Sequence, residues 1–552
     1  MKTMFFTLCL MLALLPGLWA NNVTLNDISL SDQSIATHSC NIIFDISWEN
    51  SWRTSNTVPT NWDACWVFAK YRVTGGEWHH CTLSNVSGEY FCPGGCVVNA
   101  SPDGKGVFLY RAQDGSGSID WDEIKFPWKY GIDGVNDDAE VEVKVFAIEM
   151  VYVPQGNFYI GDGNVTDEST YALHGETTDL AVQIDSTLVS NISVDSWSGY
   201  DDANLHNGLG IKGNGGLDND NNGIIDNASY PTGWRAFYIM KYETSQEQYA
   251  EFLNMLTRTQ QQARIFTDIS GTTVTNIYVM SNSIIPSSGN VIRCASDIPA
   301  APIPVTFFCD WSIDGQQDEC DGQNLVCNKL GWGDVCAYAD WTGLRPMTEL
   351  EYEKATRGPN TPVVGEYAWG NTNIAIIGVS QTDYACPNSS LVLSPNEHTG
   401  RAMCAEIGAI ILGLARCGEF ASSSVNHTRQ ESGAGYYGAM EMSGSISEPV
   451  VTLGNIAGRS FRGINGNGEL DAAGYADADY WPGINGNAES FTENGPYDGS
   501  VGVTQYAGSG FRGGHMGQYV TALMISYRYY ASMGFPLSRE DYHGARFVRS
   551  AY

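Results

Sequence analysis

The chain has 552 residues, of which 43% are hydrophobic and only 16% are charged, so it is long enough for several packed domains and too apolar for general disorder. It carries 29 Lys and Arg residues against 62 Asp and Glu residues, a formal net charge of −33, which repels nucleic-acid phosphates and anionic lipids. The composition therefore argues against a nucleic-acid-binding protein. Its 61 Gly, 29 Tyr and 15 Trp residues indicate turns, loops and aromatic-packed strands rather than a helical bundle.

The first 20 residues have the pattern of a secretory signal peptide. Lys2 precedes an apolar run from Met4 to Leu15, and a Pro-Gly break and Ala20 follow. A membrane anchor is the alternative, but the run is shorter than the roughly 20 residues that a spanning helix needs. No later segment is apolar enough to span a bilayer. We therefore predict a secreted or cell-surface protein from which residues 1–20 are removed.

Thirteen further cysteines would then enter an oxidising compartment, where disulfides form. They are Cys40, Cys65, Cys81, Cys92, Cys96, Cys294, Cys309, Cys320, Cys327, Cys336, Cys386, Cys404 and Cys417. Because thirteen is odd, at least one thiol stays free or pairs with another chain. Cys92-Pro-Gly-Gly-Cys96, with His79 and His80 nearby, resembles half of a zinc knuckle, but no second pair of closely spaced cysteines accompanies it. We expect a small-loop disulfide there and disulfides for most of the others.

The stretch from Asn41 to about Glu149 alternates apolar and polar residues in short runs. The clearest runs cover residues 43–48, 64–73 and 139–148. Alternation with a period of two, interrupted by turn residues, is typical of half-buried antiparallel strands. We therefore predict an all-β sandwich over residues 21–148, with nothing of catalytic spacing in it.

The second part of the chain has rarer strands, longer Gly-Asn-Asp loops and clear helix signals. Ser245 and Gln248 have the spacing of a capping box, and so do Thr348 and Glu351. A further helix is expected over residues 332–341. This part is predicted to be a loop-rich α+β body.

Six segments of this second part, in order along the chain, carry a family resemblance. They are Glu149–Gly161, Phe237–Phe252, Leu344–Ala355, Tyr367–Asn371, Tyr436–Glu448 and the closing strands that contain Arg512, Arg528 and Arg546. Together they resemble the formylglycine-generating enzyme (sulfatase-modifying factor) domain over residues 149–552. The resemblance implies a C-type-lectin-like fold that is poor in regular structure, and it leaves the predicted sandwich unexplained.

The resemblance also raises the question of whether the family's chemistry remains. Members that oxidise a substrate cysteine are similar in having two cysteines near the C-terminus that hold copper, and soft thiolates do select Cu(I). In this chain Ser526 stands just before Tyr527-Arg528-Tyr529, where the thiolate is expected, and no cysteine follows Cys417. The sequence therefore argues against copper as a cofactor and against the family's oxidase activity.

Two substitute metal sites remain as weaker alternatives. His515 and Met516 are acceptable copper ligands, but two ligands from one short segment make a weak signal. A relative of this fold uses iron held by histidines and a carboxylate. The histidines His398, His427, His515 and His543 are scattered here, without a helical pair at a spacing of three or four. Neither pattern favours a transition-metal site.

The residues from Asp218 to Asp226 give the strongest metal signal in the sequence. Oxygen-bearing side chains stand at positions one, three, five and nine of this loop and Gly stands at position six, which is the spacing of a calcium loop. The predicted ligands are Asp218, Asp220, Asn222, the carbonyl of Ile224, and Asp226. Ser229 occupies position twelve instead of a bidentate Glu. The alternative is a polar Asn-Gly hairpin.

The family resemblance implies a second calcium site at the turn that precedes residue 449. Carried over by position, Glu441 and Glu448 would supply carboxylates, and Gly444 and Ile446 would supply backbone carbonyls. Two departures are visible, because Glu441 replaces the usual Asn or Asp and Ser445 replaces Asn. The alternative is a solvated acidic turn.

The chain has the family's characteristic segments but not its copper-binding cysteines. We therefore favour a non-catalytic protein that binds a protein or glycan at the cell exterior, or assembles with copies of itself. Trp481 and Tyr497 lie in a Gly-Asn-rich stretch and suit recognition if they are exposed, although they can equally fill the interior. Ser526, Arg528 and His515 are further ligand-binding candidates. A subunit of an extracellular filament or coat is the second hypothesis, and a surviving metal-dependent oxidase is the third.

Overall fold

The computed structural model describes thirteen segments of the chain. They are residues 23–163, 172–175, 181–186, 192–194, 227–318, 321–376, 400–405, 414–422, 428–453, 456–482, 508–528, 530–531 and 539–552. The predicted signal peptide, the predicted calcium loop at 218–226 and Tyr497 lie outside these residues, so their predictions stay open. No helix in the described segments is long and apolar enough to cross a membrane.

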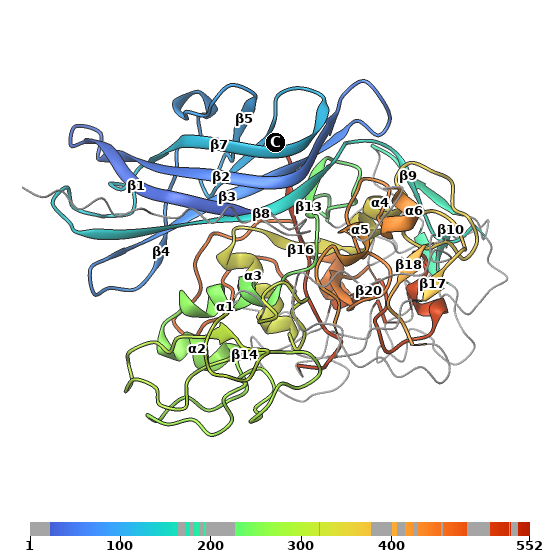
Figure 1. Cartoon of the computed structure of the whole chain (residues 1–552). Coiled ribbons are helices and arrows are strands. Elements are labelled where there is room, and N and C mark those ends of the chain that lie inside the picture. Colours follow the sequence, from blue (N-terminus) through green and yellow to red (C-terminus); the bar gives the residue numbers. More distant parts are fainter. Residues whose placement is uncertain are drawn as a thin grey trace, which may run out of the picture.

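The first part of the chain is built from eight antiparallel strands (Figure 1). They are β1 (Thr24–Ser34), β2 (Ser39–Thr54), β3 (Asn61–Val73), β4 (His79–His80), β5 (Cys96–Ala100), β6 (Val107–Arg111), β7 (Gly115–Trp128) and β8 (Val141–Val153). Strand β2 pairs with β1 and β7 along its length but with β3 only near Arg53, where the sheet turns a corner. The alternate residues of β2, such as Phe44 and Trp48, therefore pack with Phe126 of β7 and Val67 of β3 in one apolar cluster. The alternating runs are confirmed as strands.

Five strands of the second part extend the same sheet beyond β8. They are β13 (Phe237–Met240), β16 (Arg345–Thr348), β19 (Glu448–Val451), β20 (Ser509–Arg512) and β21 (Phe547–Ser550), in the order β8-β13-β21-β16-β19-β20. Strand β8 pairs with β3 over most of its length and with β13 at its end, from Met150 to Val153. The predicted domain boundary between residues 148 and 149 thus lies inside β8, a strand that both parts of the chain share (Figure 1).

The remaining strands form small two-stranded sheets in the loops. They are β9 (Phe158–Ile160) with β11 (Val182–Ile184), β10 (Leu173–Gly175) with β12 (Ile192–Val194), β14 (Ile292–Arg293) with β15 (Phe308–Cys309), and β17 (Ala375–Ile376) with β18 (Arg401–Ala402).

Strand β3 is buried on both faces, so its prediction as a half-buried strand is wrong. Its odd-numbered residues, such as Cys65 and Val67, face the cluster inside the first part. Trp66 and Phe68 point the other way, into the large core of the second part, and Trp66 Nε1 donates a hydrogen bond to the Thr342 carbonyl at 2.8 Å. Burying such a large aromatic side chain contributes roughly 1.5–3 kcal/mol. The second part of the chain therefore covers the face of β3 that the alternating pattern predicted to be exposed to solvent.

The helices are few and short, in agreement with a loop-rich α+β protein. They are α1 (Gln246–Asn254), α2 (Arg258–Arg264), α3 (Trp332–Trp341), α4 (Glu349–Arg357), α5 (Glu419–Ser422), α6 (Arg429–Ser432) and α7 (Ile456–Arg459), with 3-10 turns η1 (Ser87–Glu89) and η4 (Val520–Leu523). The predicted capping boxes at Ser245 and Thr348 are both present. Helix α2 was not predicted, although Thr257 and Gln260 form the same kind of box.

Ten described cysteines are present as thiols, so the prediction of disulfides is wrong for them. They are Cys40, Cys65, Cys81, Cys92, Cys96, Cys294, Cys309, Cys327, Cys336 and Cys417. All but Cys92 and Cys96 are buried in apolar surroundings, where a thiol packs as a small hydrophobic group. The eight buried thiols pack as core residues, whereas the side chains of Cys92 and Cys96 contact each other near the surface.

Candidate functional site

The turn from residue 441 to residue 448 leads into β19 and is held by contacts with Gly513 and with Glu243. Its backbone is left-handed at Glu441, Gly444 and Ser445, where φ is 53°, 92° and 66°. The Gly444 N–H donates to the Gly513 carbonyl at 2.8 Å, next to β20. The carboxylate of Glu243, which follows β13, accepts hydrogen bonds from Ser445 Oγ at 3.1 Å and from the Ile446 N–H at 3.3 Å. The turn and Glu243 therefore form one local unit.

Three glutamates of this unit are buried, namely Glu243, Glu441 and Glu448. Both carboxylate oxygens of Glu441 lack a hydrogen-bond partner among the described residues, and so does Oε2 of Glu448. Burial, together with the nearby Glu243 carboxylate, raises the pKa of Glu441 to about 8, against the opposing effects of Arg546 and of the Gly418 N–H, which approaches the carboxylate without reaching hydrogen-bond geometry. Burial also raises the pKa values of Glu243 and Glu448, although Arg546 opposes the rise. A buried carboxyl group without partners binds either a proton or a cation.

Arg546 is the cation beside these glutamates in the described structure. Its Nε lies 3.3 Å from Glu448 Oε1, and its Nη2 donates to the Met440 carbonyl at 2.6 Å. Its Nη1 donates to the carbonyls of Met240 and Lys241. Most of its donors are thus directed to backbone carbonyls, so one guanidinium leaves the negative charge of three carboxylates largely uncompensated.

The donor chemistry of the turn fits calcium. Calcium prefers carboxylate and carbonyl oxygens, and the orphaned oxygens of Glu441 and Glu448 are of this kind. The described segments contain no group of three or more His, Cys, Asp or Glu side chains placed to hold a metal ion. A calcium ion at this turn would therefore need the carbonyls of Gly444 and Ile446 as well. Gly513, with φ at 85°, keeps room for Glu448, because a Cβ at residue 513 would overlap with Oε2.

Ser526 and Arg528 lie in the interior, a few residues after η4. Ser526 is fully buried and its Oγ has no hydrogen-bond partner in the described segments. The Arg528 guanidinium pairs with the carboxylate of Glu349 at the start of α4, with N–O distances of 2.6 and 3.0 Å. Burial alone would raise the pKa of Glu349, but Arg528 holds it below the ordinary value. Arg528 is therefore engaged in a buried ion pair with Glu349.

His515 and Trp481 are also parts of the packed structure. His515 stacks on Tyr542 with ring centroids 4.1 Å apart, and its Nδ1 accepts a hydrogen bond from the Gly517 N–H. Burial lowers the pKa of His515 to about 4, so the ring is neutral near pH 7. Trp481 is fully buried and its Nε1 donates to the Ile464 carbonyl at 2.8 Å. Of the two alternatives for Trp481, the structure supports the one in which its side chain fills the interior.

The sequence analysis missed a second buried charge group, where the two parts of the chain meet. Lys241 Nζ lies 2.8 Å from Glu149 Oε2 and 3.7 Å from Asp63 Oδ2 of β3. Asp63 also accepts hydrogen bonds from Trp48 Nε1 and Ser51 Oγ. Burial raises the pKa values of Asp63 and Glu149, and Lys241 opposes the rise. Lys241, Glu149 and Asp63 are not related by a spacing that is typical of a metal or catalytic site, so a search for motifs does not detect them. The same is true of Glu243.

The fold and this site define a loop-rich α+β domain braced by buried ion pairs, with a carboxylate turn suited to a hard cation. A family model described as a sulfatase-modifying factor enzyme 1-like domain matches residues 137–551, and the chain belongs to this family. The match begins just before β8, so it includes the strand that joins the two parts. No curated protein matches the chain significantly.

Proposed function

We propose that this chain is an extracellular binding protein that uses the sulfatase-modifying-factor scaffold, in a C-type-lectin-like form, without the family's oxidase activity. The observation that carries the proposal is Ser526, which stands where the resemblance expects a copper-binding thiolate, in a sequence with no cysteine after Cys417. A hydroxyl is a hard ligand and does not replace a thiolate for Cu(I). The full burial of Ser526 supports the proposal, because a reactive group has to be reached by its substrate.

Calcium is the second element of the proposal. The orphaned carboxylate oxygens of Glu441 and Glu448 support a bound cation, because three buried carboxylates around one guanidinium are costly without one. Extracellular calcium modules bind with dissociation constants of about 10⁻⁴–10⁻³ M, which suits an exported protein. We infer that calcium holds this turn in shape and takes no part in turnover. The predicted loop at Asp218–Asp226 would supply a further site.

Two assays on purified protein test the absence of oxidase activity and the binding of calcium. Oxygen consumption is measured with a cysteine-containing peptide and added Cu(I), and calcium binding is measured by calorimetry on the wild type and on the Glu441→Gln/Glu448→Gln double variant. We expect no copper-dependent oxidation, and calcium binding that the double variant weakens. The Glu123→Gln/Glu140→Gln variant is the matched control, because both residues are exposed. Copper-dependent formation of oxidised thiol product would refute the first element, and unchanged calcium binding in the double variant would refute the assigned ligands.

A further inference from the structure

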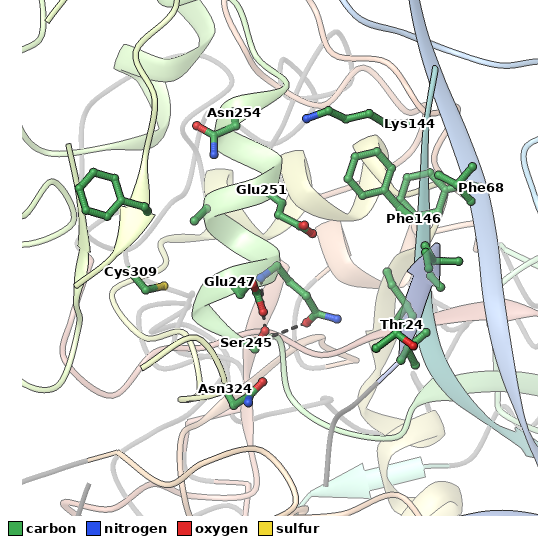
Figure 2. Close-up of a pocket in the computed structure, with 18 of the residues that line it drawn as sticks. Thr24, Phe68, Lys144, Phe146, Ser245, Glu247, Glu251, Asn254, Cys309 and Asn324 are labelled. Carbon is green, nitrogen blue, oxygen red and sulfur yellow. Dashed lines mark hydrogen bonds between the residues drawn. The ribbon is translucent and has the colours of Figure 1, made fainter. Parts of the chain in front are cut away.

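A groove of about 770 Å³ lies between the strands of the first part and helix α1 (Figure 2). The start of β1 and the middle of β8 form one wall. Helix α1, the end of α3 and strand β15 form the other. Its volume is within the range of about 300–1,000 Å³ that is typical of small-ligand sites. The groove is distinct from the turn at residues 441–448, none of whose residues line it.

One side of the groove is aromatic. Phe146 of β8 is half-buried and stacks on Phe68 of β3, with ring centroids 5.3 Å apart. Trp341 at the end of α3 meets Phe146 edge-on at 5.0 Å. These three side chains line the groove, and their packing against one another fixes the exposed part of Phe146 in place. The groove thus has a rigid apolar surface that can contact an aliphatic chain or the face of a cation.

The helical side of the groove is acidic. Glu247 and Glu251 are one turn apart on α1 and therefore lie on the same face of the helix. Figure 2 shows Glu251 projecting from the helix toward the strand that carries Phe146. Neither carboxylate makes a hydrogen bond or an ion pair in the described part of the chain. Lys144 on β8 lines the same groove, but its Nζ lies 5.5 Å from the Trp78 ring and forms no ion pair with Glu251. The groove therefore combines two partnerless carboxylates on α1 with aromatic side chains from β3, β8 and the end of α3.

We propose that this groove binds a ligand through an aliphatic ammonium group. The ammonium would pair with Glu247 and Glu251, and the attached carbon chain would lie against Phe146. Two observations favour a cation over a neutral or anionic ligand, namely the unpaired carboxylates and the formal net charge of −33, which attracts cations to the surface. The ammonium can come from a free polyamine or from a lysine side chain of a peptide. This inference goes beyond the proposed function, because it does not depend on calcium.

The electrostatics of the groove are consistent with this ligand. Glu251 is exposed to solvent at the mouth of the groove. Desolvation by the surrounding protein and the neighbouring Glu247 carboxylate nevertheless raise its pKa to about 7, and Lys144 opposes the rise. Burial also raises the pKa of Glu247. The other titratable groups that face them are the Cys309 thiol and the Tyr338 hydroxyl, whose pKa values burial raises well above the ordinary values, so both stay neutral near pH 7. An ammonium that favours the charged form of Glu251 should therefore release protons on binding near pH 7.

Calorimetry on the full chain at pH 7 tests the proposal with three probes: 1,4-diaminobutane, spermidine and a capped lysine-containing peptide. Titrations in two buffers with different ionisation enthalpies report the protons released. We expect the Glu247→Gln/Glu251→Gln variant to bind at least about tenfold more weakly, a loss of roughly 1.4 kcal/mol, and to release no protons. The Glu123→Gln/Glu140→Gln control changes the net charge equally at exposed positions outside the groove and should bind as the wild type does.

Each outcome of this experiment decides a point. Binding of the free amines alone, or of the peptide alone, supports the groove and identifies the source of the ammonium. No binding of any probe at millimolar concentration overturns the proposal, and so does an equal loss in the control variant, which would show long-range attraction only. Thermal unfolding of both variants establishes that they are folded. Repeating the titrations after calcium removal separates this proposal from the calcium site, because binding to the groove should persist.

Discussion

Replacing Glu441 by Gln should remove the loss of stability that burial of the Glu441 carboxyl causes as the pH rises in the metal-free protein. The pKa of Glu441 rises from 4.5 to about 8 on folding, because the carboxyl is buried and lies near the Glu243 carboxylate. A group whose pKa is raised on folding stabilises the fold fully below its unfolded pKa, and that contribution is lost as the pH rises toward the folded pKa. This rise corresponds to about 5 kcal/mol of unfolding free energy. Gln has a similar shape and no charge, so the variant does not incur the loss.

Urea unfolding of the wild type and of Glu441→Gln in a chelator, at several pH values between 5 and 9, measures this effect. We expect the variant to become more stable relative to the wild type as the pH rises above about 4.5, by up to about 5 kcal/mol near pH 8.5. Calcium at 100 times its dissociation constant should reduce the advantage, because it stabilises the wild type by about 2.7 kcal/mol and the variant by less. A stability difference that is independent of pH would refute the assigned burial of this charge. Glu123→Gln, at an exposed position, is the control.

Three further substitutions test the buried charges and the turn. Arg528→Gln should lower the unfolding free energy by about 3–5 kcal/mol in urea titrations, because it leaves the Glu349 carboxylate buried and unpaired. Lys241→Met should cost at least as much by the same measurement, since Glu149 and Asp63 both lose their cation. Gly513→Ala should destabilise the protein by at least about 1–2 kcal/mol, because φ is 85° there and the added Cβ displaces the Glu448 carboxylate; calorimetry should also show weaker calcium binding.

Local sequence signals predicted the secondary structure well, but they did not predict how the two parts of the chain pack against each other. The alternating runs became β2, β3 and β8, and the capping boxes at Ser245 and Thr348 begin helices. The pattern of β3 also contained Trp66 and Phe68, which could have indicated a second buried face. A period of two does not distinguish a face covered by another domain from a face in water, so this burial became visible only in the folded chain.

Of the residues at the buried carboxylate site, only those in a recognisable family motif could be predicted from the sequence. Glu441 and Glu448 followed from the family turn, and the structure places both in a buried, acidic unit. Glu243 joins them only through the fold, because no spacing relates it to the turn. Arg528 and His515 were chosen for their chemistry, but residue type alone does not reveal a partner such as Glu349, which already pairs with the Arg528 guanidinium.

Lys241 connects the first part of the chain to the carboxylate turn. Its side chain pairs with Glu149, and it approaches Asp63 of β3. Its carbonyl accepts hydrogen bonds from the Met440 N–H at 2.8 Å and from Arg546, whose guanidinium also contacts the turn. A movement of β3 would therefore shift the backbone of Lys241 and, through two hydrogen bonds, the residue that precedes Glu441. Because β8 pairs with both β3 and β13, the shape of the turn at residues 441–448 depends on β3, a strand that precedes the family match in the sequence.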